Sequence, residues 1–203
     1  MFLEQPIPSY KLKFHYVDPE LIWEYDGVGG GRFSCYAPSF SITSKSYYFV
    51  IGHFGIGDHR HGNKPTTYVV SPIECEDGNT AFRRPESFSR LWTDSGSGAS
   101  TDGTFWRVNC PNGYGSLSDL CQQGYSEPNK NTVWCIKHEY LEDDQHDTWL
   151  WDSIGAGTNN VGSVTSVDVN GGKSDLTREL VSVTTTHGAT NTMKRIKAEL
   201  IGM

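Results

Sequence analysis

The chain has 203 residues, 22 of them glycine, and it is rich in Thr, Val and aromatic residues, a composition that favours strands and tight turns over helices. Its net charge of −7 argues against nucleic acid as a main partner, because phosphate contacts need clustered lysines and arginines. No hydrophobic run approaches the roughly 20 residues of a transmembrane helix.

The first residues, Met1–Pro6, contain an early glutamate, an early proline and no apolar core, so they do not resemble a signal peptide. We therefore expect a cytoplasmic protein or one exported by a non-classical route, and the sequence leaves the compartment itself open.

The first predicted element is a strand over residues 10–16. Tyr10, Leu12, Phe14 and Tyr16 alternate with polar residues, which is typical of a half-buried strand with these four side chains on its inner face.

A short motif then occurs three times: an aliphatic residue and a tryptophan, followed by an aspartate and two glycines two positions apart. The copies cover residues 22–29, 91–98 and 150–157, and their tryptophans lie 69 and 59 residues apart. Such self-similarity predicts three related units, at about residues 10–75, 76–140 and 141–203.

Each part of this motif has a structural interpretation. A tryptophan supplies a large buried face, an aspartate accepts turn N–H groups, and glycines adopt backbone angles that other residues avoid. The predicted structural core contains four tryptophans: Trp23, Trp92, Trp106 and Trp151.

Further strands are expected after each motif, and no linker divides the chain. The tail 193–201 alternates like a strand, with a short helix as the alternative. We therefore predict a single all-β domain over residues 1–203, built as a β-prism of three antiparallel sheets with pseudo-threefold internal repeats.

The middle unit resembles a known signature. The stretches 91–99, 102–107, 111–114 and 117–120 are similar to the signature of the vacuolar protein sorting-associated protein 62 family, and residues 129–136 resemble its continuation. Val108 stands where that signature has a proline, and Ser118 where it has a glycine. The resemblance implies a β-prism similar to the multivesicular-body-associated β-prism domain and to β-prism lectins, and it implies little about biochemical activity.

Catalytic signatures are missing from the sequence, so we expect no enzyme and no cofactor. Residues 171–174 resemble the end of a phosphate loop but lack its upstream glycine, and a hairpin turn is favoured there. The five cysteines allow one or two disulfides, whose pairing the sequence leaves open: Cys35, Cys75, Cys110, Cys121 and Cys135.

Two polar segments carry metal-ligand residue types. One contains His53, His59 and His61, and the other is an acidic stretch with Glu139, Glu142, Asp143, Asp144 and Asp147. Neither has the spacing of an established metal motif. Solvated loops are favoured, no metal ligand is assigned, and metal binding stays open.

The glycine-rich turns are the candidate ligand site, because aspartate carboxylates and turn N–H groups can bond sugar hydroxyls while a ring such as Tyr25 or Trp106 stacks on the sugar. The candidate residues are Asp26, Gly29, Asp94, Gly96, Gly98, Asp152, Gly155 and Gly157.

Three functions remain in view. The first is a non-enzymatic, lectin-like binding module that recognises a glycan or a membrane-surface headgroup. The second is a self-assembling structural protein that forms a lattice or filament in an extracellular or mineral-associated matrix. The third, a trafficking or pore-forming accessory domain, follows only from the family name and from analogy between β-prisms.

Overall fold

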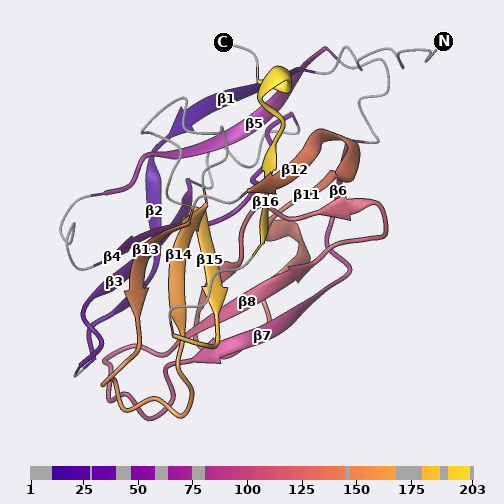
Figure 1. Ribbon diagram of the computed structural model, residues 1–203. Coiled ribbons are helices and arrows are strands. Elements are labelled where there is room, and N and C mark those ends of the chain that lie inside the picture. The colour runs from indigo at the N-terminus through magenta and orange to yellow at the C-terminus, as the bar shows by residue number, and fades with distance from the viewer. Residues whose placement is uncertain are drawn as a thin grey trace.

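The computed structural model describes residues 11–27, 29–39, 47–57, 64–74, 81–144, 147–167, 180–187 and 192–201. These residues form antiparallel strands joined by turns, with three short 3-10 helices, so the all-β prediction is confirmed (Figure 1). Within them, no helix has the length and apolar character needed to cross a membrane.

The strands fall into three consecutive groups. The first group comprises β1 (Lys11–Val17), β2 (Pro19–Tyr25), β3 (Phe33–Pro38), β4 (Phe54–Gly57) and β5 (Thr67–Glu74). The second comprises β6 (Phe82–Arg83), β7 (Ser87–Thr93), β8 (Gly103–Asn109), β9 (Tyr114–Gly115), β10 (Leu120–Gln123), η2 (Lys130–Thr132), β11 (Cys135–Lys137) and η3 (His138–Tyr140). The third comprises β12 (Leu141–Asp144), β13 (Asp147–Asp152), β14 (Ser163–Val167), β15 (Leu180–Thr184), β16 (Met193–Ile196) and η5 (Ala198–Leu200).

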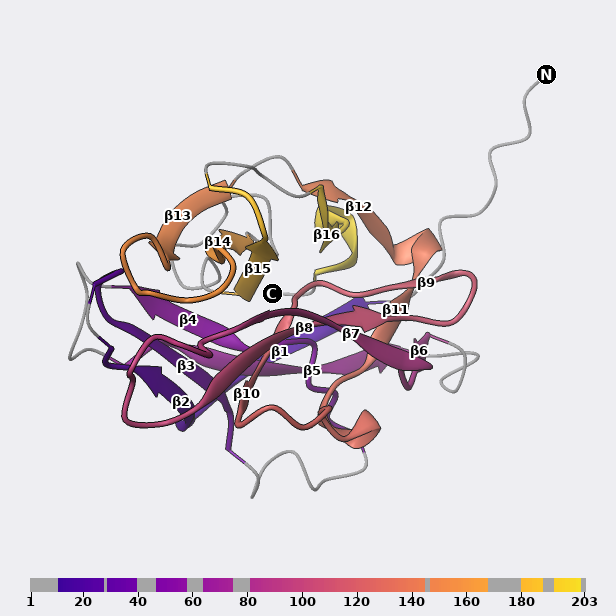
Figure 2. The same cartoon turned by 90° about the horizontal axis from the view of Figure 1, so that it is seen from below.

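Each group follows the same pairing plan. The outer strands pair as β1–β5, β6–β11 and β12–β16, and the inner strands form the three-stranded runs β2-β3-β4, β7-β8-β10 and β13-β14-β15. In the view of Figure 2, β13, β14 and β15 lie on one side of the molecule and β2, β3 and β4 on another. The repeat seen in the sequence is therefore a repeat of strand pairing.

Hydrogen bonding divides the described strands into five sheets. The first and third inner runs join through the single pair Leu180↔Phe54 into one six-stranded sheet, whereas β10-β8-β7 stays separate. The pairs β1–β5 and β12–β16 and the strands β6-β11-β9 form the other sheets. A prism of three sheets is thus not confirmed, and it stays a prediction together with the single-domain boundaries.

The same β-bulge precedes the repeated tryptophan in all three inner hairpins. The strand register shifts between Leu21 and Trp23, between Arg90 and Trp92, and between Trp149 and Trp151. A bulge adds one residue to one strand and bends it. The extra residue is the aliphatic member of each motif, which explains why an aliphatic residue and a tryptophan recur together.

The three indoles connect the hairpins in a cycle. Trp23 Nε1 donates to Thr101 O at 3.2 Å, Trp92 Nε1 donates to Asn160 O at 2.9 Å, and Trp151 Nε1 donates to Gly31 O at 3.3 Å. The three tryptophans pair across their own hairpins with Cys35, Phe105 and Val164. The acceptor residue in each hairpin lies four positions before this strand partner of the tryptophan. The three bonds are therefore equivalent, and each unit is fastened to the next.

Two main apolar clusters fill the interior. The aromatic cluster contains Trp23, Trp92 and Trp151, each at most 2% exposed, with Phe33 and Phe105 packed between them. The second cluster is mostly aliphatic and gathers side chains from β1, β4, β5, β11, β15 and β16. Trp106, also buried, belongs to a small third cluster with Phe88 and Leu120.

Two predictions about strands need correction. Tyr16 was expected on the inner face of the first strand but is 56% exposed, because the second cluster reaches only Leu12 and Phe14 of β1. In the tail, a strand is confirmed over Met193–Ile196, but Ala198–Leu200 forms a 3-10 helix.

Candidate functional site

The three glycine-rich turns meet at one end of the molecule, the lower end in Figure 1. All five candidate glycines, Gly29, Gly96, Gly98, Gly155 and Gly157, have φ between 70° and 90°. Residues with a Cβ atom avoid this left-handed region, so these turns need glycine.

The turns also pack directly against one another. A Cβ atom on Gly29 would lie 2.0 Å from Gly155 O, and one on Gly96 would lie 3.0 Å from Gly157 O. Asp26 joins the first turn to the second, since its carboxylate accepts hydrogen bonds from Ser100 N at 2.9 Å and from Ser100 Oγ at 2.5 Å. The turns form one joined surface instead of three separate loops.

The three aspartates of the motif do not occupy equivalent positions. Asp26, Asp94 and Asp152 follow their tryptophans by three, two and one residues. Asp94 is 3% exposed and accepts a hydrogen bond from the Tyr125 hydroxyl at 2.9 Å, and burial raises the pKa of its carboxyl. Asp152 accepts from Ile154 N at 3.0 Å and lies 3.3 Å from His187 Nδ1.

Ser153 takes the place of Asp94 in the third unit. Its N–H donates to Gly162 O as that of Asp94 donates to Gly103 O, and its hydroxyl accepts from Gly162 N. The structure therefore brings the candidate residues together, but it gives each aspartate its own internal partner.

Tyr25 and Trp106 were suggested as rings that stack on a sugar. That suggestion is wrong, because Tyr25 is fully buried and Trp106 is 7% exposed. Both rings pack inside apolar clusters, where a ligand has no access to them.

A polar hollow of about 240 Å³ opens beside the first and second turns. Its lining includes Glu24, Asp26, Ser100, Thr101 and Gln123, with Trp23 behind them. Leu21, 51% exposed, also borders the hollow. Of the predicted ligand residues, Asp26 is the one that contributes to this hollow.

A larger groove of about 620 Å³ was not predicted from the sequence. It is lined by parts of β2 and β3, by Tyr48 and Arg84, and by the segment from Asn129 to Trp134 that contains η2. The two nearby asparagines and the tryptophan of this segment were visible in the sequence. Only the fold brings Tyr48 and Arg84 to them.

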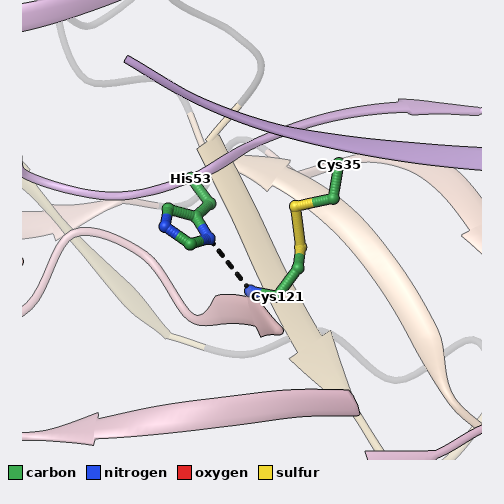
Figure 3. A group of neighbouring side chains, drawn as sticks. All are labelled: Cys35, His53 and Cys121. Carbon is green, nitrogen blue, oxygen red and sulfur yellow. Dashed lines mark hydrogen bonds between the residues drawn. A yellow bond between two sulfur atoms is a disulfide. The ribbon is translucent and has the colours of Figure 1, made fainter. Parts of the chain in front are cut away.

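The histidine segment divides between the interior and the undescribed residues. His59 and His61 lie outside the described residues, whereas His53 is buried beside the disulfide Cys35–Cys121 (Figure 3). His53 Nδ1 accepts a hydrogen bond from Cys121 N at 3.2 Å, and burial lowers the pKa of the imidazole to about 4. The potential ligand atoms of Cys35, His53 and Cys121 lie within 4.8 Å of one another, but the two sulfurs are bonded to each other.

A second disulfide, Cys110–Cys135, lies within the middle unit. Cys35–Cys121, in contrast, joins β3 of the first unit to β10 of the second. The sequence left both pairings open, and Cys75 lies outside the described residues.

The acidic stretch was expected to be a solvated loop, but most of it is strand β12. Glu142 pairs with Arg195 at 2.9 Å and Asp143 pairs with Lys194, both across the β12–β16 ladder, while Glu139 pairs with Lys137 at 2.8 Å. These carboxylates are neutralised by basic neighbours. The side chain of Asp147 is not among those described.

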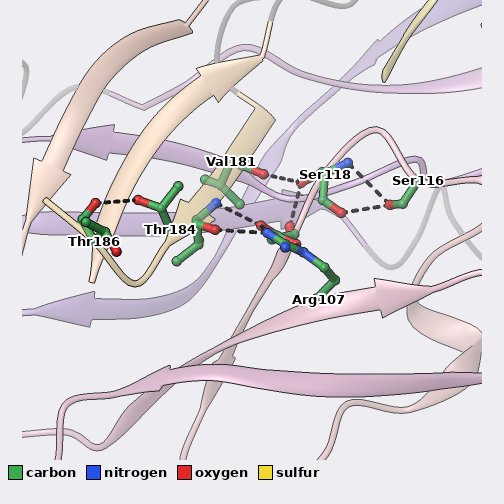
Figure 4. Close-up of polar contacts among 8 residues, drawn as sticks. Arg107, Ser116, Ser118, Val181, Thr184 and Thr186 are labelled. Atoms are coloured by element: carbon green, nitrogen blue, oxygen red, sulfur yellow. Dashed lines mark hydrogen bonds and ion pairs between the residues drawn. The ribbon is translucent and has the colours of Figure 1, made fainter. Parts of the chain in front are cut away.

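Two residues of the family-like signature form an ion pair that reaches the third unit (Figure 4). Arg107 donates two hydrogen bonds of 3.1 Å to the buried carboxylate of Asp119 and one of 2.9 Å to Val183 O on β15. Val183 N donates back to Asp119 at 2.8 Å. The hydrogen bonds to Asp119 raise the pKa of Arg107, while burial raises that of Asp119.

Ser118, which replaces the signature's glycine, also has a structural role. Its hydroxyl accepts a hydrogen bond from His53 N at 3.3 Å. A Cβ atom on Gly52 would lie 2.3 Å from Ser118 Cβ, so the serine is accommodated because residue 52 is a glycine. Signature residues in the middle unit thus hold the three units together.

The family model described as "Vacuolar protein sorting-associated protein 62" matches residues 20–199. The chain therefore belongs to this family, and the resemblance inferred from the sequence is confirmed. No curated protein matches the chain. The described fold is similar to the crystal structure of GNIP1Aa from Chromobacterium piscinae, with a TM-score of 0.75 and 21% sequence identity. That similarity covers 94% of this chain but 38% of GNIP1Aa, and at this identity it shows the fold alone.

Proposed function

We propose that the chain is a non-enzymatic binding module, built as a β-prism, that recognises the hydroxyl groups of a glycan at the hollow beside the first two turns. The observation that carries the proposal is the composition of this hollow: two carboxylates, two hydroxyls and an amide beside three apolar side chains, of which Leu21 is half-exposed. Carboxylates and amides are suitable partners for sugar hydroxyls, because together they accept and donate hydrogen bonds. Leu21 offers a surface for the apolar face of a sugar ring.

The surrounding hydrogen bonds support such a role because they hold lining groups in place. Asp26 is oriented by two hydrogen bonds from Ser100, and Thr101 O accepts a hydrogen bond from Trp23 Nε1. Groups that are already in place lose little conformational freedom when a ligand binds. A cradle of this size suits one sugar unit, with the rest of a glycan extending into solvent.

A glycan array followed by calorimetry tests the proposal. We expect a neutral glycan to bind the wild-type chain, and Asp26→Asn to weaken this binding by at least about tenfold, since the loss of one charged hydrogen-bond acceptor typically costs about 1.5–3 kcal/mol. Asp152→Asn is the matched control, because Asp152 belongs to another turn and does not line the hollow. Equal weakening by both variants, or no binding to any glycan, would contradict the proposal.

Self-assembly is the second candidate function, and one observation favours it. Trp149 is 50% exposed on β13, which is the edge strand of the six-stranded sheet among the described strands. Exposed edges with apolar side chains can pair with another copy of the chain. Light scattering across protein concentration distinguishes the two candidates: a binding module keeps a constant mass, whereas a lattice former grows, and Trp149→Lys should stop that growth.

A further inference from the structure

The groove lined by Arg84 and Trp134 lies apart from the turns and is distinguished by the way in which it holds one arginine. The Arg84 guanidinium carbon lies 3.6 Å from the centroid of the Trp134 ring, so the two groups stack. Arg84 Nη1 donates to Asn131 O at 2.8 Å and to Val133 O at 3.1 Å. The plane and the position of the guanidinium are therefore both restrained.

These contacts leave part of the guanidinium unused. Arginine has five N–H donors, and the two carbonyls occupy those of Nη1. Within the described part of the chain, Nε and Nη2 donate to no acceptor, and no carboxylate forms an ion pair with Arg84, Glu20 of the same groove included. Nε and Nη2 together form the edge that binds a carboxylate through two parallel hydrogen bonds.

The lining also offers four neutral polar side chains next to the charge of Arg84, together with the carboxylate of Glu20. Asn129 uses its side-chain oxygen to accept from Asn131 N at 2.8 Å, which leaves the side-chain NH₂ available as a donor. Asn131, Thr132 and Tyr48 also line the groove. Its volume of about 620 Å³ lies within the usual range for small-molecule sites, which is about 300–1,000 Å³.

We infer that this groove is a second binding site, specific for a sugar acid, in which Arg84 binds the carboxylate and the side chains around η2 bind the hydroxyls of the ring. The positive charge of Arg84 favours an anionic ligand, and the coplanar N–H donors of Nε and Nη2 favour a carboxylate. Apart from Glu20, the other polar side chains of the lining are neutral, which favours a polyhydroxylated ring over an acidic peptide. The lining of this groove shares only Ile22 with the lining of the hollow beside the turns. The inference about the groove can therefore be tested independently of the function proposed above.

The first experiment compares four ligands with the wild-type chain by calorimetry or ligand-observed NMR. We expect glucuronate to bind at least about tenfold more tightly than glucose, because the two share the ring and differ in the carboxylate. Its affinity should fall as salt is raised, because ions screen the charge pair. Equal binding of glucose would overturn the inference, as would preferred binding of glucose 6-phosphate or of a capped glutamate peptide.

Variants then assign the binding to Arg84. Arg84→Lys keeps the charge but loses the two-pronged geometry, and Arg84→Gln loses both, so we expect the affinity for glucuronate to fall stepwise through the two variants. Arg90→Gln is the matched control, because it removes one positive charge from an exposed position on β7, outside the groove. Unchanged affinity in Arg84→Gln, or equal loss in Arg90→Gln, would overturn the assignment. The wild-type comparison of ligands stands even if an Arg84 variant fails to fold.

Discussion

The end that carries the three turns and the side that carries the groove are built in different ways. At the turns, the three units use the same bulge, the same tryptophan and the same indole-to-carbonyl hydrogen bond. At the groove, Arg84, Asn129 and Trp134 come from the middle unit alone and face β2 and β3 of the first unit.

This difference separates residues that close the fold from residues that are free to recognise a ligand. The repeated groups are occupied by one another, as the aspartates and the indoles show. The groove is instead lined by different segments of two neighbouring units. The hollow at Asp26 combines both kinds of role, since Asp26 accepts hydrogen bonds from Ser100 within the fold and also lines an open space.

The largest loss of stability is expected from a change in the tryptophan that all three units repeat. Trp92→Ala removes a fully buried indole and its bond to Asn160, and it should lower the free energy of unfolding by about 3–5 kcal/mol. Denaturant unfolding followed by far-UV circular dichroism measures the loss. Trp149→Ala, at an exposed position, should cost less than about 0.5 kcal/mol, and similar losses in both variants would contradict the role given to the aromatic cluster.

Asp119→Ala breaks the ion pair through which the middle unit holds the third. It removes the acceptor of two Arg107 hydrogen bonds and that of Val183 N, so we expect a loss of about 3 kcal/mol in the free energy of unfolding. Asp143→Ala is the control, since its pair with Lys194 is exposed and exposed pairs contribute about 0–1 kcal/mol. If the two variants lose the same amount, Asp119 does not fasten β15.

His53 should make the fold sensitive to acid, because it is neutral and buried next to the disulfide that joins the first two units. Its folded pKa of about 4 lies below the ordinary value of 6.5, so its contribution is complete above pH 6.5 and is lost as the pH falls through 4. The full loss amounts to about 3 kcal/mol. His53→Asn should flatten this part of the stability curve, whereas exposed His138→Asn should leave it unchanged; a curve that is the same in all three proteins would contradict the assignment.

The smallest expected effect is a difference in stability between alanine variants of two glycines with similar backbone angles. Gly98→Ala places a methyl group in open space at φ 70°, so only backbone strain of about 1 kcal/mol is expected. Gly29→Ala adds a clash with Gly155 O to the same strain and should lower the melting temperature further. Equal melting temperatures would show that the first and third turns do not pack as described.

Several features follow from the sequence because they depend on local chemistry. The alternation of polar and apolar residues predicted strands, and the repeated glycines predicted turns with unusual backbone angles, because these properties belong to a few neighbouring residues. The spacing of the tryptophans predicted three related units. The signature of the middle unit identified the family.

Other features depend on residues that lie far apart in the chain, and only the tertiary structure decided them. The partners of the three motif aspartates are one example, since Asp26 accepts from Ser100, Asp94 from Tyr125 and Asp152 from Ile154 N. The pairing of Cys35 with Cys121, separated by 86 residues, required the first two units to be packed together. The groove at Arg84 exists because β2 and β3 of one unit lie beside η2 of the next, a contact between distant residues that no local pattern records.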